Sequence, residues 1–146
     1  MKAATLEWLK AGDFDPKTME KLLNDEFLTG MVAFHAQQLT EKTFKALFEE
    51  KNIDVPKIHS LLTLWKRIAP CWEEFPLLKE DILYRLDQLY IDARYPGNLG
   101  LLPDGAPSIA DAFEFYKFSR GFNDRMGTGK LCFDLCRKSG IAGTAR

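Results

Sequence analysis

Four side chains that can bind an anion or exchange a proton occur at helical spacing in the first half of the chain. They are His35, Gln38, Lys42 and Lys45, which are separated by three, four and three residues. In an α-helix this spacing places all four on one face, within about 80° of arc. Polar groups on a face that also carries core residues are costly to bury unless they are paired. We therefore expect them to meet carboxylates, backbone carbonyls, water or a ligand.

A second polar series lies further along the chain. Asp87, Tyr90 and Arg94 are again three and four residues apart, and Tyr95 follows directly. Asp87 and Arg94 would supply opposite charges along one helical face, with the Tyr90 hydroxyl between them. Both tyrosines suit packing as well as stacking on a base. We expect the two series to line a cleft between their helices.

The basic residues of the first series have two interpretations. Lys42 and Lys45 can hold a phosphate, or they can pair with Glu41, with Asp87 or with an acid of a partner chain. His35 can contact a ligand, or it can be a neutral imidazole satisfied inside the fold. The spacing alone leaves both interpretations open.

The sequence predicts no catalytic residues, no metal ligands and no cofactor. The three cysteines make an odd number, which argues against a disulfide framework. Cys132 and Cys136 can share a helical face, but no histidine follows residue 59, and two thiols alone do not make a zinc site. We expect the cysteines to be free thiols.

The elements that must position these residues are helices. The stretch from Phe27 to Glu50 lacks proline and consists mostly of good helix formers. Its large apolar side chains fall on almost every side, which places the helix at the centre of the domain or between its own core and a partner chain. The second interpretation predicts a homodimer.

Four further helices are expected around this one. The first is interrupted by Gly12 and by Asp15-Pro16, so either it kinks there or a new helix starts with Asp15 as its cap. Ser108, with Asp111 three residues later, resembles a capping box at the start of the last helix. The remaining apolar spacing predicts helices over residues 58–68, 78–93 and 108–126.

Length and composition are those of one globular domain. The chain has 146 residues, 46% of them hydrophobic, and a net charge of -1, so it lacks the global basic field that drives nonspecific nucleic-acid binding. It has no apolar stretch long enough to span a membrane, and we expect a cytoplasmic protein. We predict an all-α fold, an up-down antiparallel bundle of four to five helices over residues 1–126, followed by a tail over 127–146.

The segments FHAQQLTEKTFKAL (34–47) and LDQLYIDARYPG (86–97) resemble the two signatures of the HEPN domain family. The resemblance extends over roughly residues 4–126. Gly12 and Pro16 depart from the family pattern in the first helix. The matching positions are His35, Gln37, Gln38, Glu41, Lys42 and Lys45 in the first signature, and Asp87, Tyr90, Arg94, Tyr95 and Pro96 in the second.

The resemblance implies a helical bundle, a homodimer and a minimal nucleotidyltransferase partner, the two proteins forming a toxin-antitoxin type pair. Other family members are RNases, which carry an arginine followed four to six residues later by a histidine. Here His35 and His59 both precede the first arginine, Arg67, so that motif is absent. We therefore do not expect an enzyme of the usual HEPN kind.

Three functions follow from these observations. The first is a module that binds a nucleotide or RNA with the two polar series. The second is a structural or protein-interaction module whose polar series form an internal network. The third is a divergent RNase that uses an unfamiliar pair such as His35 and Arg94.

Overall fold

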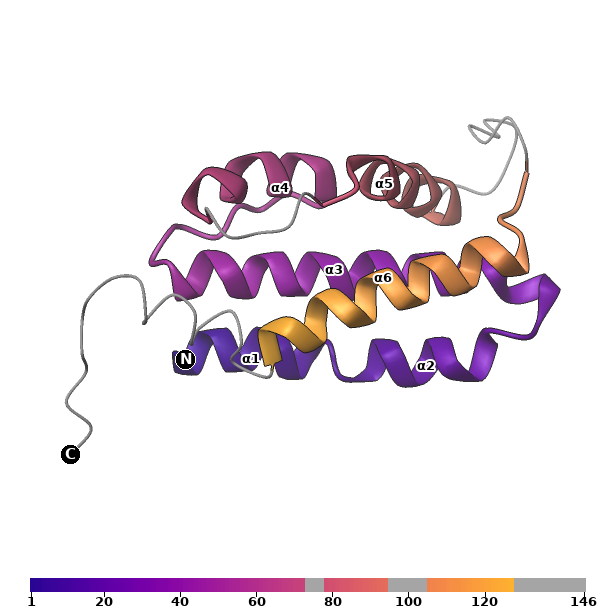
Figure 1. The fold of residues 1–146 in the computed structure, drawn as a ribbon, viewed down its shortest axis with the longest axis horizontal. Helices are drawn as coiled ribbons and strands as arrows, with labels where there is room; N and C mark the ends of the chain where they lie inside the picture. Colours follow the sequence, from indigo (N-terminus) through magenta and orange to yellow (C-terminus); the bar gives the residue numbers. More distant parts are fainter. Residues whose placement is uncertain (73–77, 95–104, 128–146) are drawn as a thin grey trace.

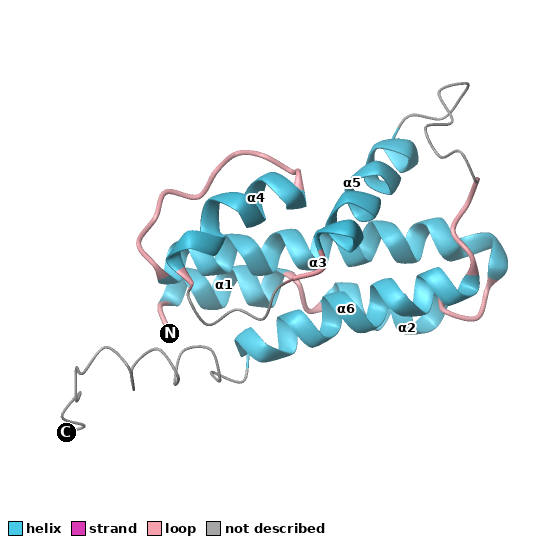
Figure 2. Ribbon diagram, turned by 45° about the horizontal axis from the view of Figure 1, so that its top comes forward, coloured by secondary structure: helices cyan, strands magenta, loops and turns pink. Residues whose placement is uncertain are grey.

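Helix α3 (Thr29–Glu50) lies at the centre of the molecule, and the other helices pack around it (Figure 1). The computed structural model describes residues 1–72, 78–94 and 105–127, with residues 92–94 as backbone only. These residues form helices, turns and loops but no strand (Figure 2), which confirms the predicted all-α bundle. The other helices are α1 (Ala3–Ala11), α2 (Phe14–Leu22), α4 (Leu61–Ile68), α5 (Glu80–Arg94) and α6 (Ile109–Gly127).

The first predicted helix is divided into α1 and α2, and Gly12 lies at the junction. A Cβ atom at Gly12 would lie 3.0 Å from Leu39 Cδ1 and 3.2 Å from the Leu9 carbonyl oxygen. Glycine thus lets the junction pack directly on α3. Of the two alternatives, a new helix is correct, but it starts at Phe14. Asp15 is therefore in its first turn and is not its cap.

Side chains cap two of the other helices. Ser108 Oγ accepts a bond of 3.0 Å from the Asp111 N–H, and Asp111 Oδ2 accepts one of 2.9 Å from the Ser108 N–H. This is the predicted capping box of α6. Helix α4 is shorter than predicted, because Ser60 caps it by accepting a bond of 3.3 Å from the Thr63 N–H.

The helices around α3 do not all alternate in direction. Helices α1 and α2 run antiparallel to α3, whereas α6 runs parallel to it (Figure 1). Helix α4 also follows the direction of α3, since Gln37 bonds the His59 carbonyl and Phe44 packs 6.1 Å from Trp65 further along both helices. The chain runs back along α3 between Glu50 and Leu61, so α3 and α4 point in the same direction although they are consecutive helices.

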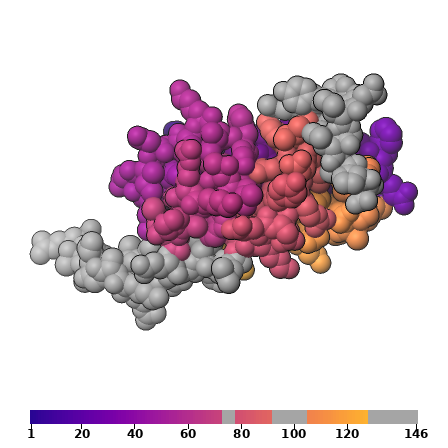
Figure 3. Space-filling view, turned by 90° about the horizontal axis from the view of Figure 1, so that it is seen from above, coloured from indigo at the N-terminus to yellow at the C-terminus, as the bar shows by residue number. Residues whose placement is uncertain are grey.

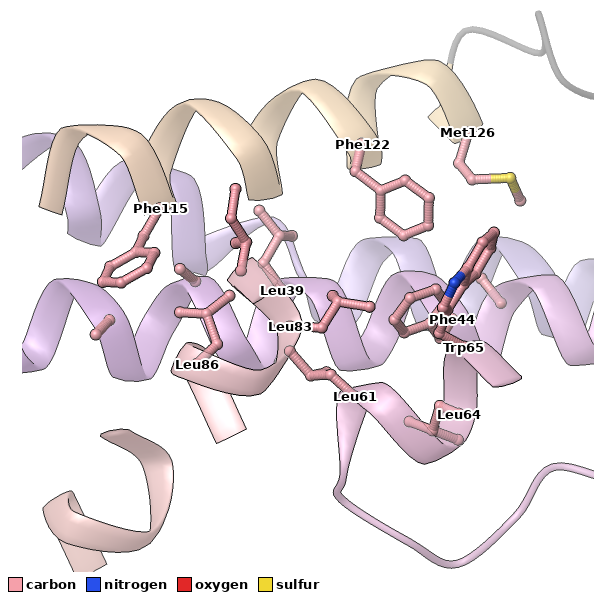
Figure 4. Packing of buried hydrophobic residues seen from close by; sticks show 14 of the residues in the cluster. Leu39, Phe44, Leu61, Leu64, Trp65, Leu83, Leu86, Phe115, Phe122 and Met126 are labelled. Atoms are coloured by element: carbon pink, nitrogen blue, oxygen red, sulfur yellow. The ribbon is translucent and has the colours of Figure 1, made fainter. Parts of the chain in front are cut away.

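The core is built on α3 and draws apolar side chains from the other helices (Figure 4). Phe44 contacts the ring of Phe122 on α6 at 5.1 Å between centroids. Fourteen of the 22 residues of α3 are buried by the chain itself. The apolar circumference of this helix, from which we predicted a homodimer, is therefore largely covered without a second copy.

The predicted C-terminal tail and the question of a membrane span complete the comparison with the sequence. Residues 128–146, which hold nearly all of the predicted tail together with Cys132 and Cys136, lie outside the described residues. Among the helices described, none combines the length and apolar character needed to cross a membrane.

Candidate functional site

Asp15 of α2 binds two members of the first polar series. Its side chain is 6% exposed, with Oδ1 2.9 Å from His35 Nδ1 and Oδ2 2.7 Å from Lys42 Nζ. The His35 and Lys42 side chains are 22% and 24% exposed. Contrary to our expectation, these two residues do not line a cleft with α5. They point to α2, because the division at Gly12 lets the first turn of α2 reach α3.

Glu41 is the centre of a second group of polar contacts. Its Oε1 accepts bonds from Lys45 Nζ at 2.7 Å and from His59 Nδ1 at 3.0 Å, and its Oε2 accepts one from Gln37 Nε2 at 3.1 Å. Gln38 Nε2 in turn donates to Gln37 Oε1 at 2.7 Å. The pairing of Lys45 with Glu41 is one of the alternatives that the sequence left open.

Asp87 holds the N-terminus of α4. Its carboxylate accepts bonds from Ser60 Oγ at 2.9 Å and from the backbone N–H groups of Leu61 at 2.7 Å and Leu62 at 3.2 Å. Burial raises the pKa of Asp87, and these N–H donors oppose the rise. Arg94 was expected to supply the opposite charge to Asp87 on the same helical face. The side chain of Arg94 and the whole of Tyr95 lie outside the described part of the chain.

Tyr90 packs between aromatic neighbours. Its side chain is buried, and its ring is stacked on Phe34 of α3 with 5.8 Å between centroids and 14° between planes. The His59 imidazole lies 6.2 Å away on another side. Stacking of this kind fixes the orientation of the Tyr90 ring.

The segment 59–62 between the link and α4 is thereby held from two helices. We call it the His59 corner. Gln37 and Glu41 of α3 bond His59, and Asp87 of α5 bonds Leu61 and Leu62. The two signature segments therefore act on the same short piece of chain.

A pocket of about 360 Å³ lies between the His59 corner and α5. Figure 3 shows this face of the molecule, with α4 in magenta beside α5 in salmon. The volume is within the usual range for small-molecule sites. The pocket is lined by His59, Ser60, Leu62, Tyr84, Asp87, Gln88, Tyr90 and Ile91.

Aromatic side chains form part of the wall of this pocket, together with a few hydrogen-bonding groups. Because a carboxylate only accepts, the bond from His59 to Glu41 places a proton on Nδ1 and leaves Nε2 for another partner. Tyr84 is 57% exposed and can offer a ring face to a ligand. In the described part of the chain, no three His, Cys, Asp or Glu side chains are placed to hold a metal ion.

Sequence reasoning missed several of these residues. From the sequence, Asp15 was expected only as a possible helix cap, and His59 entered only as a histidine that precedes every arginine. Tyr84, Gln88 and Ile91 were not singled out, although their spacing of four and three residues indicates one face of a helix. The signal that could have found them is that Tyr84 and Ile91 place large side chains on the helical face opposite the apolar stripe of Ile82, Leu86 and Leu89.

Comparison with known proteins places the chain in a family. A family model for the HEPN domain matches residues 5–122, a range that includes both polar series. No curated protein matches the chain significantly, and neither does any solved structure. At the family level, the match indicates a helical module related to nucleotides or RNA. The match covers most of the sequence, and the chain therefore belongs to the HEPN domain family.

Proposed function

We propose that this protein is a non-catalytic HEPN module that binds a nucleotide in the pocket between the His59 corner and α5. The observation that carries the proposal is the pocket itself, which has the volume of a small-ligand site and contains Asp87 and Tyr90 of the second signature. The first signature supports the same place indirectly, because Gln37 and Glu41 hold His59.

The pocket suits a nucleobase better than it suits a highly charged group. Tyr84 and Leu62 provide surface on which an aromatic base can stack or pack, and His59 Nε2 and Gln88 provide hydrogen-bonding groups. The Asp87 carboxylate lies against the N-terminus of α4, whose positive end offsets its charge. A base would therefore meet ring faces and neutral polar groups.

The proposal assigns different roles to the residues predicted from the sequence. Asp87 and Tyr90 shape the pocket wall. Lys45 and Gln38 act at a distance, through Glu41 and Gln37. His35 and Lys42 belong to the separate Asp15 group, and Arg94 and Tyr95 stay candidate ligand contacts at the end of α5.

A titration with AMP tests the pocket. Tyr84→Ala should weaken AMP binding by roughly 5- to 100-fold, the size of a lost base-aromatic stack. Phe27→Ala removes an aromatic side chain that is 92% exposed and does not line the pocket, so it is the matched control. The affinity for AMP is measured by isothermal titration calorimetry on variants that are shown to be folded. Equal affinities of the wild type and Tyr84→Ala would show that AMP does not bind in this pocket.

We further propose that the protein acts in the cytoplasm as a homodimer, with a minimal nucleotidyltransferase as its partner in a toxin-antitoxin type pair. The support is the family membership. Light scattering should give about twice the 16.7 kDa mass of the chain. Co-expression with the product of an adjacent nucleotidyltransferase gene should yield a stable complex. A monomer that does not bind that product would argue against both parts.

A second candidate function has its own support. His35, Gln38, Lys42 and Lys45 each bond to a side chain of the same chain, as expected of a module whose polar series fix the helix register. A protein that binds no nucleotide, and whose variants at these positions melt early, would favour this interaction module. RNA cleavage lost on His35→Ala would instead favour the divergent RNase.

A further inference from the structure

The two ring nitrogens of His35 are in different states. Nδ1 lies 2.9 Å from Asp15 Oδ1, and because a carboxylate only accepts hydrogen bonds, Nδ1 carries the proton of the neutral ring. Nε2 therefore holds a lone pair, and no residue that the structure describes bonds it. The side chain is 22% exposed, so solvent reaches part of the ring. An imidazole that is held in one tautomer with Nε2 available is a positioned nucleophile.

A cation lies beside this nucleophile. Lys42 Nζ binds Asp15 Oδ2 at 2.7 Å, so the ammonium group and the His35 ring share one carboxylate. An ammonium group has three N–H donors, and the bond to Asp15 uses one of them. Lys42 is 24% exposed, which leaves the other donors for an anion at the surface. A nucleophile next to a cation suits a group that is both electrophilic and negatively charged, such as a phosphoryl group.

The second histidine, His59, shows what distinguishes His35. Its Nδ1 also bonds a buried carboxylate that holds a lysine, since Glu41 Oε1 accepts bonds from both His59 and Lys45. The His59 side chain is 56% exposed, so reactivity governed by access alone would favour it. However, Lys45 is only 9% exposed, and His59 shares its pocket with the Asp87 carboxylate, which repels an incoming anion. A phosphoryl group should therefore select His35 over the more exposed histidine.

We propose that His35 is a phosphoryl-acceptor site, which takes the group from a phosphoramidate donor such as the phosphohistidine of another protein. The Nε2 lone pair forms a bond to phosphorus while the P–N bond of the donor breaks. The donor reacts in its N-protonated form, so it keeps the electron pair of that bond and leaves as a neutral nitrogen base. The Nδ1 proton stays between His35 and Asp15, and the positive charge of the phosphorylated ring faces a carboxylate.

Lys42 completes the site by turning its remaining N–H groups to the phosphoryl oxygens. Asp15 acts through the His35 ring and is a positioning residue. The site lies between α2 and α3, and none of its three side chains lines the pocket beside the His59 corner. The inference is therefore independent of nucleotide binding.

Phosphoramidate itself is the donor in the test. Intact-mass measurement of the wild-type protein at neutral pH should show the gain of one phosphoryl group, which acid removes because the N–P bond is labile in acid. Peptide mapping at neutral pH should place the group on His35 and not on His59. His35→Gln should abolish the labelling, although His59 is still present. The labelling rate of His35 should exceed that of N-acetylhistidine under the same conditions.

Two further variants test the neighbours of the ring. Lys42→Met should slow the labelling roughly 10- to 100-fold, the size of a lost charge-assisted hydrogen bond. Lys21→Met removes an exposed cation of α2 and is the matched control, with an unchanged rate. Asp15→Ala should slow the labelling, and the ring nitrogen chemical shifts of His35 should change from the Nδ1–H tautomer to a mixture. Asp15→Asn keeps an acceptor oxygen and should restore the tautomer.

Three results would overturn the inference. The first is labelling of His59 in preference to His35, or of both at the rate of N-acetylhistidine, because access alone would then explain the reaction. The second is the absence of any label on the wild-type protein. The third is an equal rate in Lys42→Met and wild type. Each of them leaves the AMP titration of the pocket unaffected, so this inference and the proposed function fail separately.

Discussion

The ammonium group of Lys45 lies 2.7 Å from Glu41 Oε1, one turn earlier on α3, and the two side chains are only 9% and 8% exposed. A pair this deeply buried does not stabilise the fold strongly as a pair, because both charges have lost water. Its members nevertheless depend on one another. Removal of either leaves a charge in the protein interior without its partner.

We expect Glu41→Ala to be strongly destabilising. The change strands the buried Lys45 ammonium and removes the acceptor for His59, so the free energy of unfolding should fall by about 3 kcal/mol or more. Urea denaturation measures the loss. Glu49→Ala on the same helix is the control and should change stability by less than about 0.5 kcal/mol. A loss below about 1 kcal/mol at Glu41 would mean that Lys45 reaches water.

Asp15→Ala should also lower stability, but by less. His35 and Lys42 would lose their shared carboxylate, yet each is already about a quarter exposed and can be hydrated in place. We expect a loss of about 1.5 kcal/mol, the lower end for hydrogen bonds to charged groups. Asp13→Ala removes an exposed acid two residues away and should be close to neutral. Similar thermal melts for the two variants would contradict the role of Asp15.

The close approach of Gly12 to α3 predicts opposite effects of the same substitution at two glycines. Gly12→Ala pushes a methyl group against Leu39 and the Leu9 carbonyl, and overpacking of this kind costs about 1–3 kcal/mol. Gly121→Ala, in α6, meets nothing within 4 Å and should stabilise the protein by roughly 0.5–1 kcal/mol through helix propensity. Chemical denaturation should therefore shift in opposite directions. A stabilised Gly12→Ala would show that the α1–α2 junction is loosely packed.

The contribution of Asp87 to the free energy of unfolding should decrease as pH rises. Burial raises its pKa above the usual 3.8, so the folded protein keeps this proton at pH values where the unfolded chain has released it. The stability advantage of wild type over Asp87→Asn should decline from about pH 3.8 up to the raised pKa and then stay constant. Ser60 remains the cap of α4, and the amide oxygen of an asparagine at position 87 can still accept a bond from the Leu61 N–H, so the variant should fold.

Asp111→Asn provides the contrast for that experiment. The Ser108 N–H, bonded to the carboxylate, lowers the pKa of Asp111, against a smaller opposing effect of burial. Its stabilising contribution is therefore present above pH 3.8 and is lost as pH falls through the lowered pKa. Unfolding curves of the two variants should thus differ from wild type with opposite pH trends. The same trend in both would contradict the assigned environment of Asp87.

The sequence was sufficient for features that depend on neighbours in the chain. The proline-free stretch from Phe27 to Glu50 gives α3 within two residues of its observed start, and Ser108 with Asp111 gives the capping box. Both features follow from helix propensity and from the spacing of residues that are close in sequence, so they can be predicted without the tertiary structure. Helical spacing also put His35 and Lys42 on one face correctly.

Partners on other helices were the part that spacing could not supply. Asp15 is 20 residues from His35 and 27 from Lys42, and nothing in the pattern of α3 tells which helix will lie against that face. The same holds for Asp87, whose partners on α4 lie 25 to 27 residues earlier. The pocket depends on both placements, so its location emerged only from the packed structure.

The parallel packing of α6 on α3 has a consequence for synthesis. Thr43 bonds Asn123 across 80 residues, and Phe44 receives its ring contact from Phe122. A ribosome that adds about 5–20 residues per second needs roughly 4–15 s to extend the chain from the end of α3 to the end of α6. During that interval the side of α3 that α6 covers in the folded protein stays exposed. This apolar surface is where we expect a chaperone to bind the nascent chain.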